Sequence, residues 1–362
     1  MIPFAACLRR HTFALAGGLG FLLLGCSHAT AQQSLELEAR FGPAALQQRQ
    51  THAAVDVMTL GDGAQRVYVF MPALPALHGK VPMVFLHHGW QGMNPLNFGG
   101  LIDHLARSGQ VVIYPVYQES AETSPQVVTA NAAQADRRAL SALAERFSLT
   151  PDPKRVLYYG YSMGAAISLN LTLDPHHDQL PAPRALVLIA PGDAYHVAHG
   201  DEGRSIIGPV EKLPADLPVA ILAGSADTSI GLPTARQLAA RMCGIHPDRR
   251  VLMVLPGGEH DGKKVHAGHG SPGAPDSRYN FALDRHDIPN RIPGRDGFEP
   301  SPSLNQLDFY GYWKVVDAMI DGLATDRLPD VVFGHGTPAQ LYLGGWPDGS
   351  GYPPIQLEQP CR

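Results

Sequence analysis

Residues 154–171 constrain the fold of this 362-residue chain more than any other stretch. The β-branched and aromatic run 156–159 leads through a Gly-x-Ser-x-Gly pattern, at Gly160, Ser162 and Gly164, into small and apolar residues at helical spacing. This order predicts a strand, a tight turn and a helix. A serine on so sharp a turn has strained backbone angles, and the two glycines let the flanking segments pass without a Cβ clash. We expect a nucleophile at this turn; the alternative is a bystander serine in a glycine-rich turn.

Alternating strands and helices surround this unit. Apolar strands are expected at residues 82–87, 110–114, 184–190, 219–223 and 250–255, and helices at residues 97–108, 126–147, 233–242 and 307–323. Strands that are apolar throughout and alternate with helices are typical of a mostly parallel sheet covered by helices on both faces. The alternating runs 53–60 and 65–71 flank Gly61-Asp62-Gly63 and predict an N-terminal β-hairpin.

We expect one α/β domain over residues 32–362. The connection 191–218 is weakly periodic and could form a small lid, and residues 261–303 form a long loop rich in Gly, Pro, His, Asp and Arg. The tail 324–362 is expected to be irregular. At 44% hydrophobic residues the chain can bury a large core, and the net charge of −5 without a long basic run argues against a nucleic-acid partner.

Residues 1–31 have the composition of a targeting segment. Basic residues precede an apolar run at 13–24, and Ala29-Thr-Ala31 supplies the small residues of a cleavage site, so the protein is expected to be exported. An alternative signal overlaps it, because Leu23-Leu-Gly-Cys26 resembles a bacterial lipoprotein box. We expect the membrane to be a partner only if Cys26 is lipidated.

Export changes the expectation for the cysteines. Cys7 lies in the removed segment, which leaves Cys243 and Cys361 in an oxidising compartment. We expect these two to form a disulfide that ties the C-terminal tail to a helix. The alternative is two unpaired buried thiols.

A serine nucleophile needs a base and an orienting carboxylate. The turn that carries Ser162 is called the nucleophile elbow. In a sheet of this kind the carboxylate and then the histidine follow the elbow in the chain, each just past the carboxyl end of a strand. Asp227 follows the strand at 219–223 and His260 follows the strand at 250–255. We therefore predict Ser162 as nucleophile, Asp227 as orienting carboxylate and His260 as general base and acid. The competing residues are Asp193 as the acid, and His266 and His269 as the base.

The segment 87–92, His-His-Gly-Trp-Gln-Gly, directly follows the strand at 82–87. An acyl-transfer site needs a second backbone N–H at this place. Gly89 would let the chain turn close to the substrate, and the N–H groups of Trp90 and Met163 would form the oxyanion hole. We also expect Tyr161 and Trp90 to line an acyl or aromatic substrate pocket.

With these residues identified, the chain resembles the α/β-hydrolase family. Gly-Tyr-Ser-Met-Gly and His-Gly-Trp-Gln-Gly are similar to the motifs of secreted bacterial esterases near the dienelactone-hydrolase, chlorophyllase and polyester-hydrolase branches. The resemblance covers residues 53–323 and implies the α/β-hydrolase fold and hydrolysis by serine, without naming a substrate. Dienelactone hydrolases carry cysteine as nucleophile, so Ser162 speaks against that activity. The long insertion after His260 departs from the smaller members.

We expect an exported hydrolase that cleaves small-molecule or polymeric carboxylic esters through an acyl-enzyme, without a cofactor. Two alternatives stay open: a serine peptidase or amidase on the same fold, and a catalytically silent binding protein. His260, Asp261, His266 and His269 are ligand-type residues at spacings that zinc accepts. They lie in a loop that would not fix their geometry, so we predict no metal site.

Overall fold

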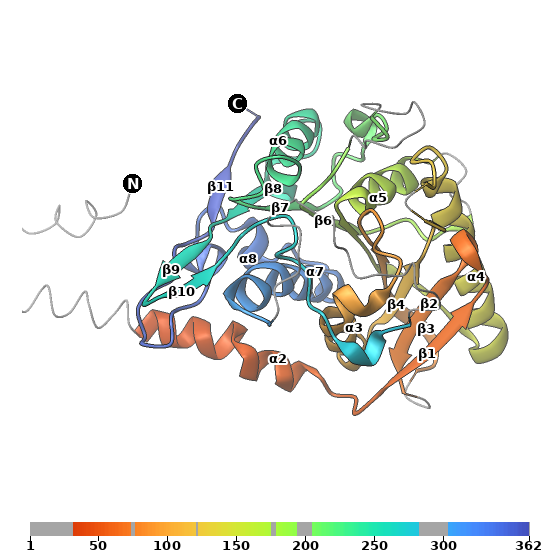
Figure 1. The fold of residues 1–362 in the computed structure, drawn as a ribbon, viewed down its shortest axis with the longest axis horizontal. Helices are drawn as coiled ribbons and strands as arrows, with labels where there is room; N and C mark the ends of the chain where they lie inside the picture. Colours follow the sequence, from red (N-terminus) through yellow and green to blue (C-terminus); the bar gives the residue numbers. More distant parts are fainter. Residues whose placement is uncertain are drawn as a thin grey trace, which may run out of the picture.

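The computed structural model describes residues 32–73, 77–120, 122–174, 179–193, 205–281 and 303–361. The expected signal segment, with Cys26, lies outside the described residues. The fold is built around a nine-stranded sheet with the strand order β1-β2-β4-β3-β5-β6-β7-β8-β11 (Figure 1). In the part of the chain that is described, no helix is long and apolar enough to span a bilayer.

The centre of the sheet is parallel. Strands β4, β3, β5, β6, β7 and β8 pair in parallel, while β1 and β2 at one edge and β11 at the other are antiparallel to their neighbours. The strands are β1 (Val55–Leu60), β2 (Val67–Pro72), β3 (Gly79–His87), β4 (Val111–Pro115), β5 (Leu149–Tyr161), β6 (Ala185–Ile189), β7 (Val219–Gly224), β8 (Arg250–Leu255) and β11 (Gln356–Glu358). The central strands are buried on both faces, which explains why their sequences are apolar throughout.

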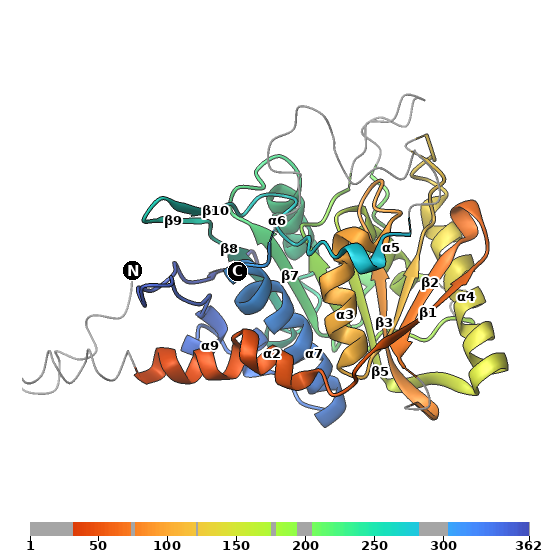
Figure 2. The same ribbon diagram turned by 60° about the horizontal axis from the view of Figure 1, so that its bottom comes forward.

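Helices cover both faces of the sheet. On one face, α4 (Val128–Phe147), α5 (Met163–Leu173) and α6 (Gly231–Arg241) contribute to one hydrophobic core. On the other face, α3 (Gly99–Arg107), α7 (Lys314–Thr325) and α8 (Asp330–Phe333) contribute to a second core. Figure 2 shows α4 and α3 on opposite sides of the strands. The predicted sheet, the predicted N-terminal hairpin and the predicted helices are confirmed, with ends that differ by a few residues.

The polar N-terminal stretch is more ordered than its sequence indicates. Residues 32–41 are helical and α2 (Pro43–Arg49) follows. Arg49 at the end of α2 makes a bidentate ion pair with Asp321 of α7, with N–O distances of 2.8 and 2.9 Å. These helices lie along α7 (Figures 1 and 2). Leu46 and Phe41 add apolar contacts to the core, but the partners of these helices are distant in sequence, so a local pattern could not predict their packing.

Two segments expected to be irregular contain regular structure. After β8, the strands β9 (Gly258–His260) and β10 (Lys263–Val265) form a hairpin, with β9 just before the predicted long loop and β10 at its start. In the tail, α8, α9 (Pro338–Leu341) and β11 form, and β11 pairs with β8. The predicted helix at 307–323 is present, but its first part, Leu307–Trp313, is a π-helix. Residues 282–302, and residues 194–204 within the connection 191–218 proposed as a lid, lie outside the described residues.

The predicted disulfide between Cys243 and Cys361 is present, with 5.7 Å between the two Cα atoms. Cys243 follows α6, and Cys361 follows β11. The bond therefore fastens the last strand of the sheet to a helix that covers the neighbouring strands.

Candidate active site

Ser162 lies between β5 and α5 with the unusual backbone angles φ 53° and ψ −120°. A Cβ at Gly164 would lie 1.9 Å from the carbonyl oxygen of His87, and one at Gly160 would lie 2.5 Å from the Cα of Ala165. Neither position has room for a side chain. The two glycines therefore allow the strained turn that the sequence predicted, and the elbow presses directly against the end of β3.

The side chain of Ser162 is part of a buried chain of hydrogen bonds. Its Oγ is 3.0 Å from Nε2 of His269, and Nδ1 of His269 is 2.7 Å from Oδ2 of Asp227. All three residues are buried, with exposed fractions of 6% for Ser162, 5% for His269 and 2% for Asp227. Serine, imidazole and carboxylate in this order can pass a proton from the hydroxyl to the ring while the carboxylate fixes the tautomer.

The prediction of His260 as the base is wrong. Its Nε2 lies 2.8 Å from Oδ2 of Asp348 and 3.2 Å from Oγ of Ser350, and its ring stacks on Trp346. His260 closes the β9–β10 hairpin against the tail and is partly exposed. The hairpin moves the base further along the chain, and His269, one of the two competing histidines, takes the position beside Ser162.

The competing acid, Asp193, has another role. Its Oδ1 accepts hydrogen bonds from the Oγ of Ser205 and from the backbone N–H groups of Ile206 and Ile207. It joins the two ends of a connection whose middle lies outside the described residues. Asp227, in contrast, follows β7 directly and faces His269.

The segment that carries His269 is fixed against the loop that carries Asp227. The Ala226 N–H donates to the carbonyl oxygen of Ala267 at 2.9 Å. A Cβ at Gly224 would lie 2.1 Å from that same oxygen, and one at Gly231 would lie 2.0 Å from Oδ2 of Asp227. Gly224 therefore lets the base and acid loops approach each other closely, and Gly231 leaves room for the Asp227 carboxylate.

The chain beyond His269 crosses to α3. The N–H of Ala274 donates to the Asn97 carbonyl, the Asp276 N–H donates to the Leu96 carbonyl, and the Gly100 N–H donates to the Ala274 carbonyl, all at 2.8 to 3.0 Å. The described part of the predicted long loop is thus a strap along the start of α3. It holds His269 between two packed elements.

The predicted oxyanion loop lies beside the elbow. A Cβ at Gly89 would lie 3.1 Å from the Cβ of Ser162, so only a glycine lets this loop approach the serine so closely. Tyr117 donates its hydroxyl to the His88 carbonyl, and Tyr114 donates to the Gly92 carbonyl at 2.5 Å. Because these two hydrogen bonds hold the carbonyls of His88 and Gly92, the loop between them is fixed next to the start of α5.

Met163 is the first residue of α5. The first N–H groups of a helix have no partner within the helix, and the helix dipole favours negative charge at this end. The predicted donor Met163 is therefore suitably placed beside the serine. The second predicted donor, Trp90, is half-buried in the oxyanion loop, and its role stays a prediction.

His88, in the same loop, is fully buried. Burial lowers the pKa of its imidazole to about 4, so the ring is neutral in neutral solution. Its Nδ1 lies 2.6 Å from the Gly89 carbonyl oxygen and its Nε2 lies 2.9 Å from the Val116 carbonyl oxygen. A neutral imidazole carries one N–H, so one of these contacts is a donated hydrogen bond. His88 therefore supports the loop and takes no part in proton transfer to Ser162.

Tyr161 and Trp90 were expected to line a substrate pocket, but the Tyr161 side chain is packed inside the site. The Tyr161 ring is only 6% exposed, packs against Phe98 and the ring of His269, and lies where a Cβ of Gly89 would be. Its hydroxyl donates to the His269 carbonyl at 2.8 Å. Tyr161 is thus a support of the site, while the pocket role of Trp90 stays a prediction.

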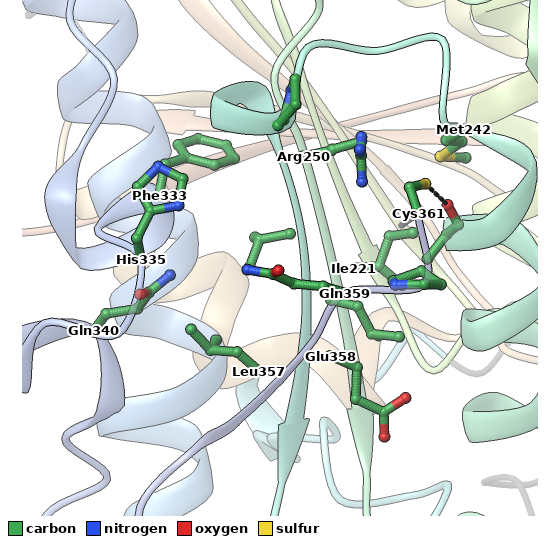
Figure 3. A pocket seen from close by; sticks show the side chains of 15 residues that line it. Ile221, Met242, Arg250, Phe333, His335, Gln340, Leu357, Glu358, Gln359 and Cys361 are labelled. Carbon is green, nitrogen blue, oxygen red and sulfur yellow. Dashed lines mark hydrogen bonds between the residues drawn. The ribbon is translucent and has the colours of Figure 1, made fainter. Parts of the chain in front are cut away.

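A cavity of about 140 Å³ lies elsewhere, at the start of β8. Figure 3 shows Phe333 and His335 on one side of it and Met242 and Cys361 on the other. Ser162, Asp227 and His269 lie past the carboxyl ends of the strands, so this cavity is at the opposite end of β8 and does not serve them. Within the described ranges, no group of three or more His, Cys, Asp or Glu side chains could hold a metal ion.

Among the comparisons with known proteins, the one with solved structures finds similar chains. No family model matches the sequence, and no curated protein matches it. Esterase 2 of Thermogutta terrifontis, phosphorylated by paraoxon, is 20% identical with a TM-score of 0.44, over 59% of this chain and 86% of that one. A candidate dienelactone hydrolase of Klebsiella pneumoniae is 18% identical with a TM-score of 0.41, over 57% of this chain and 88% of that one.

The α/β-hydrolase fold expected from the sequence agrees with the structure. The sheet is parallel at its centre, the serine lies on a strained turn between β5 and α5, and the acid and the histidine follow β7 and β8 in chain order. The site therefore combines a serine, a base, an acid and a helix N-terminus at one edge of the sheet.

Proposed function

We propose that this chain is a serine hydrolase of carboxylic esters. The observation that carries the proposal is the continuous contact from Asp227 through His269 to the Oγ of Ser162. A hydroxyl is a weak nucleophile unless a base removes its proton as it attacks, and this contact supplies the base. The strained turn keeps Ser162 at the edge of the sheet, where an ester carbonyl can reach it.

The reaction proceeds through an acyl-enzyme. The Oγ of Ser162 attacks the ester carbonyl while Nε2 of His269 accepts the hydroxyl proton, and Asp227 stabilises the imidazolium. The N–H of Met163 and one N–H of the oxyanion loop bind the oxyanion; Trp90 is the candidate for the second donor. The imidazolium protonates the departing alkoxide. Water, deprotonated by His269, then releases the carboxylate and regenerates Ser162.

The test is activity of the Ser162→Ala variant on short-chain p-nitrophenyl esters. The variant is expected to lose at least about a thousandfold in kcat, with an unchanged melting temperature. Wild-type activity in this variant would refute the proposal. A matched panel of anilides identifies the alternative amidase, which would cleave the amide with a kcat/KM equal to or above that of the ester.

We propose further that the enzyme is exported. The Cys243–Cys361 disulfide supports this, because disulfides persist in oxidising compartments. Expression of the full chain in a bacterial host, followed by fractionation and N-terminal sequencing, is expected to give a mature protein beginning at Gln32. A product lipidated at Cys26 and recovered in the membrane fraction would favour the lipoprotein alternative, and an unprocessed cytoplasmic chain would overturn export.

A further inference from the structure

The residue directly before the serine contacts both the oxyanion loop and the base. Tyr161 ends β5, and its ring occupies the space that a side chain at Gly89 of the oxyanion loop would need, with 2.8 Å from a Gly89 Cβ to its Cε1. The same ring lies 5.3 Å from the ring of His269, measured between centroids. Its hydroxyl donates to the backbone carbonyl of His269 at 2.8 Å.

The need for such a contact follows from the position of the base. His269 lies well beyond the end of β8, because the β9–β10 hairpin intervenes, and no strand fixes its backbone. Its segment is held instead through consecutive carbonyls. The carbonyl of Ala267 accepts from the Ala226 N–H, and that of Gly268 accepts from Oγ of Ser271. The carbonyl of His269 itself accepts from Tyr161.

Resting on the proposed function, we infer that Tyr161 is a positioning residue for the base: its hydroxyl fixes the backbone of His269 so that the ring lies between Asp227 and Ser162. The hydroxyl is suited to this role because it is a permanent donor. Burial, with a smaller effect of the Asp227 carboxylate, raises the pKa of Tyr161 far above its ordinary value, so the phenol is protonated at neutral pH.

The same hydrogen bond ties the base to the residue that is covalently next to the serine. Tyr161 and Ser162 are neighbours, so a shift of the elbow moves the donor that holds His269 by the same amount. We therefore expect this hydrogen bond to keep Nε2 of His269 near the Oγ of Ser162. Misplacement of a catalytic group by 1 Å can lower a rate by about a hundredfold, so a single hydrogen bond at this place affects catalysis more than stability.

Strand β5 provides a matched control. Tyr159 lies two residues earlier and is fully buried, and its hydroxyl has no hydrogen-bond partner among the described residues. Tyr161→Phe and Tyr159→Phe therefore remove the same atom from the same strand, but only the first breaks a contact to the base.

The experiment compares both variants on a p-nitrophenyl ester, with active sites counted by the phenolate burst so that only folded enzyme is measured. Tyr161→Phe is expected to lower kcat about ten- to a hundredfold with KM within about twofold, while Tyr159→Phe keeps wild-type kinetics. Equal kinetics in the two variants would overturn the inference, provided that Ser162→Ala is inactive. An active Ser162→Ala would instead refute the proposed function.

A double-mutant cycle separates positioning from general support. In the His269→Ala background the base is absent, so adding Tyr161→Phe is expected to change the residual rate by less than about twofold. If Tyr161→Phe lowers the rate by the same factor in both backgrounds, the hydroxyl acts independently of His269 and the inference fails.

Discussion

Nδ1 of His269 lies 2.7 Å from Oδ2 of Asp227, although the two residues are 42 positions apart in the chain. Both side chains are buried, and Oδ1 of Asp227 has no hydrogen-bond partner in the described part of the chain. The carboxylate therefore contacts the His269 ring through one of its two oxygens.

Replacing the two candidate histidines separates their roles. His269→Ala is expected to lower kcat at least about a thousandfold because it removes the base, whereas His260→Ala is expected to keep kcat within about threefold because that ring contacts Asp348 of the tail. Steady-state kinetics of the two purified variants on one ester measures this. Loss of activity in His260→Ala with retention in His269→Ala would reverse the assignment.

Asp227→Asn tests the carboxylate. An amide in place of Oδ2 cannot accept the Nδ1–H bond in the same way and favours the wrong imidazole tautomer, so kcat is expected to fall by roughly 10³- to 10⁴-fold with little change in KM. Asp193→Asn is the matched control and should stay within a few-fold of wild type, since Asp193 bonds the Ser205–Ile207 segment. Equal kinetics for both variants would remove Asp227 from the mechanism.

Gly164→Ala is expected to disrupt the elbow. The added methyl group would lie 1.9 Å from the carbonyl oxygen of His87, and neither backbone can move without displacing Ser162 or the oxyanion loop. We expect a loss of about 3 kcal/mol or more in the free energy of unfolding, together with loss of activity. Gly351→Ala is the control, because a Cβ there meets nothing within 4 Å. Urea unfolding measures the stability of both variants. Equal stabilities would contradict the close contact between Gly164 and the His87 carbonyl.

The disulfide is expected to stabilise the whole domain. Cys243 and Cys361 are separated by 118 residues, so the bond restricts a large part of the unfolded chain. The Cys243→Ser/Cys361→Ser variant should lose about 3 to 5 kcal/mol of unfolding free energy. Its melting temperature should not respond to a reducing agent, whereas that of the wild type should fall toward the variant's value. A wild-type melting temperature that is insensitive to full reduction would contradict this.

Asp308 of the π-helix predicts a pH dependence of stability. Burial raises the pKa of this carboxyl to about 7 from 3.8, and its Oδ1 has no partner in the described ranges. Between these pH values the folded state keeps a proton that the unfolded state has released. The Asp308 contribution to the unfolding free energy therefore falls as the pH rises from about 4 to 7. Asp308→Asn should flatten this fall in urea titrations at pH 5 and pH 8, and an unchanged difference would contradict it.

The sequence predicted the parts of the fold whose strands are buried on both faces, because only such strands carry long apolar runs. Ser162 and Asp227 were found because each follows such a strand directly. His269 could not be selected in the same way. The hairpin that displaces it consists of two three-residue strands, Gly-Glu-His and Lys-Lys-Val, which have too few apolar residues to reveal a period.

The same reasoning explains the tail and the N-terminal helices. Strand β11 is Gln-Leu-Glu, and only its pairing with β8 makes it a strand. The helices at 32–49 are held in part by the ion pair between Arg49 and Asp321, which joins segments near opposite ends of the chain. Tyr161 was expected in a pocket wall, and its role at His269 depends on a contact across 108 residues.

The most direct test of the central claim, that His269 activates Ser162 as a nucleophile, is labelling with a fluorophosphonate followed by peptide mass spectrometry. Wild-type protein is expected to carry the phosphonyl group on Ser162, and His269→Ala to react at least about a hundredfold more slowly, while His260→Ala reacts at the wild-type rate. Labelling at a different residue, or labelling of Ser162 at an unchanged rate in His269→Ala, would contradict the account.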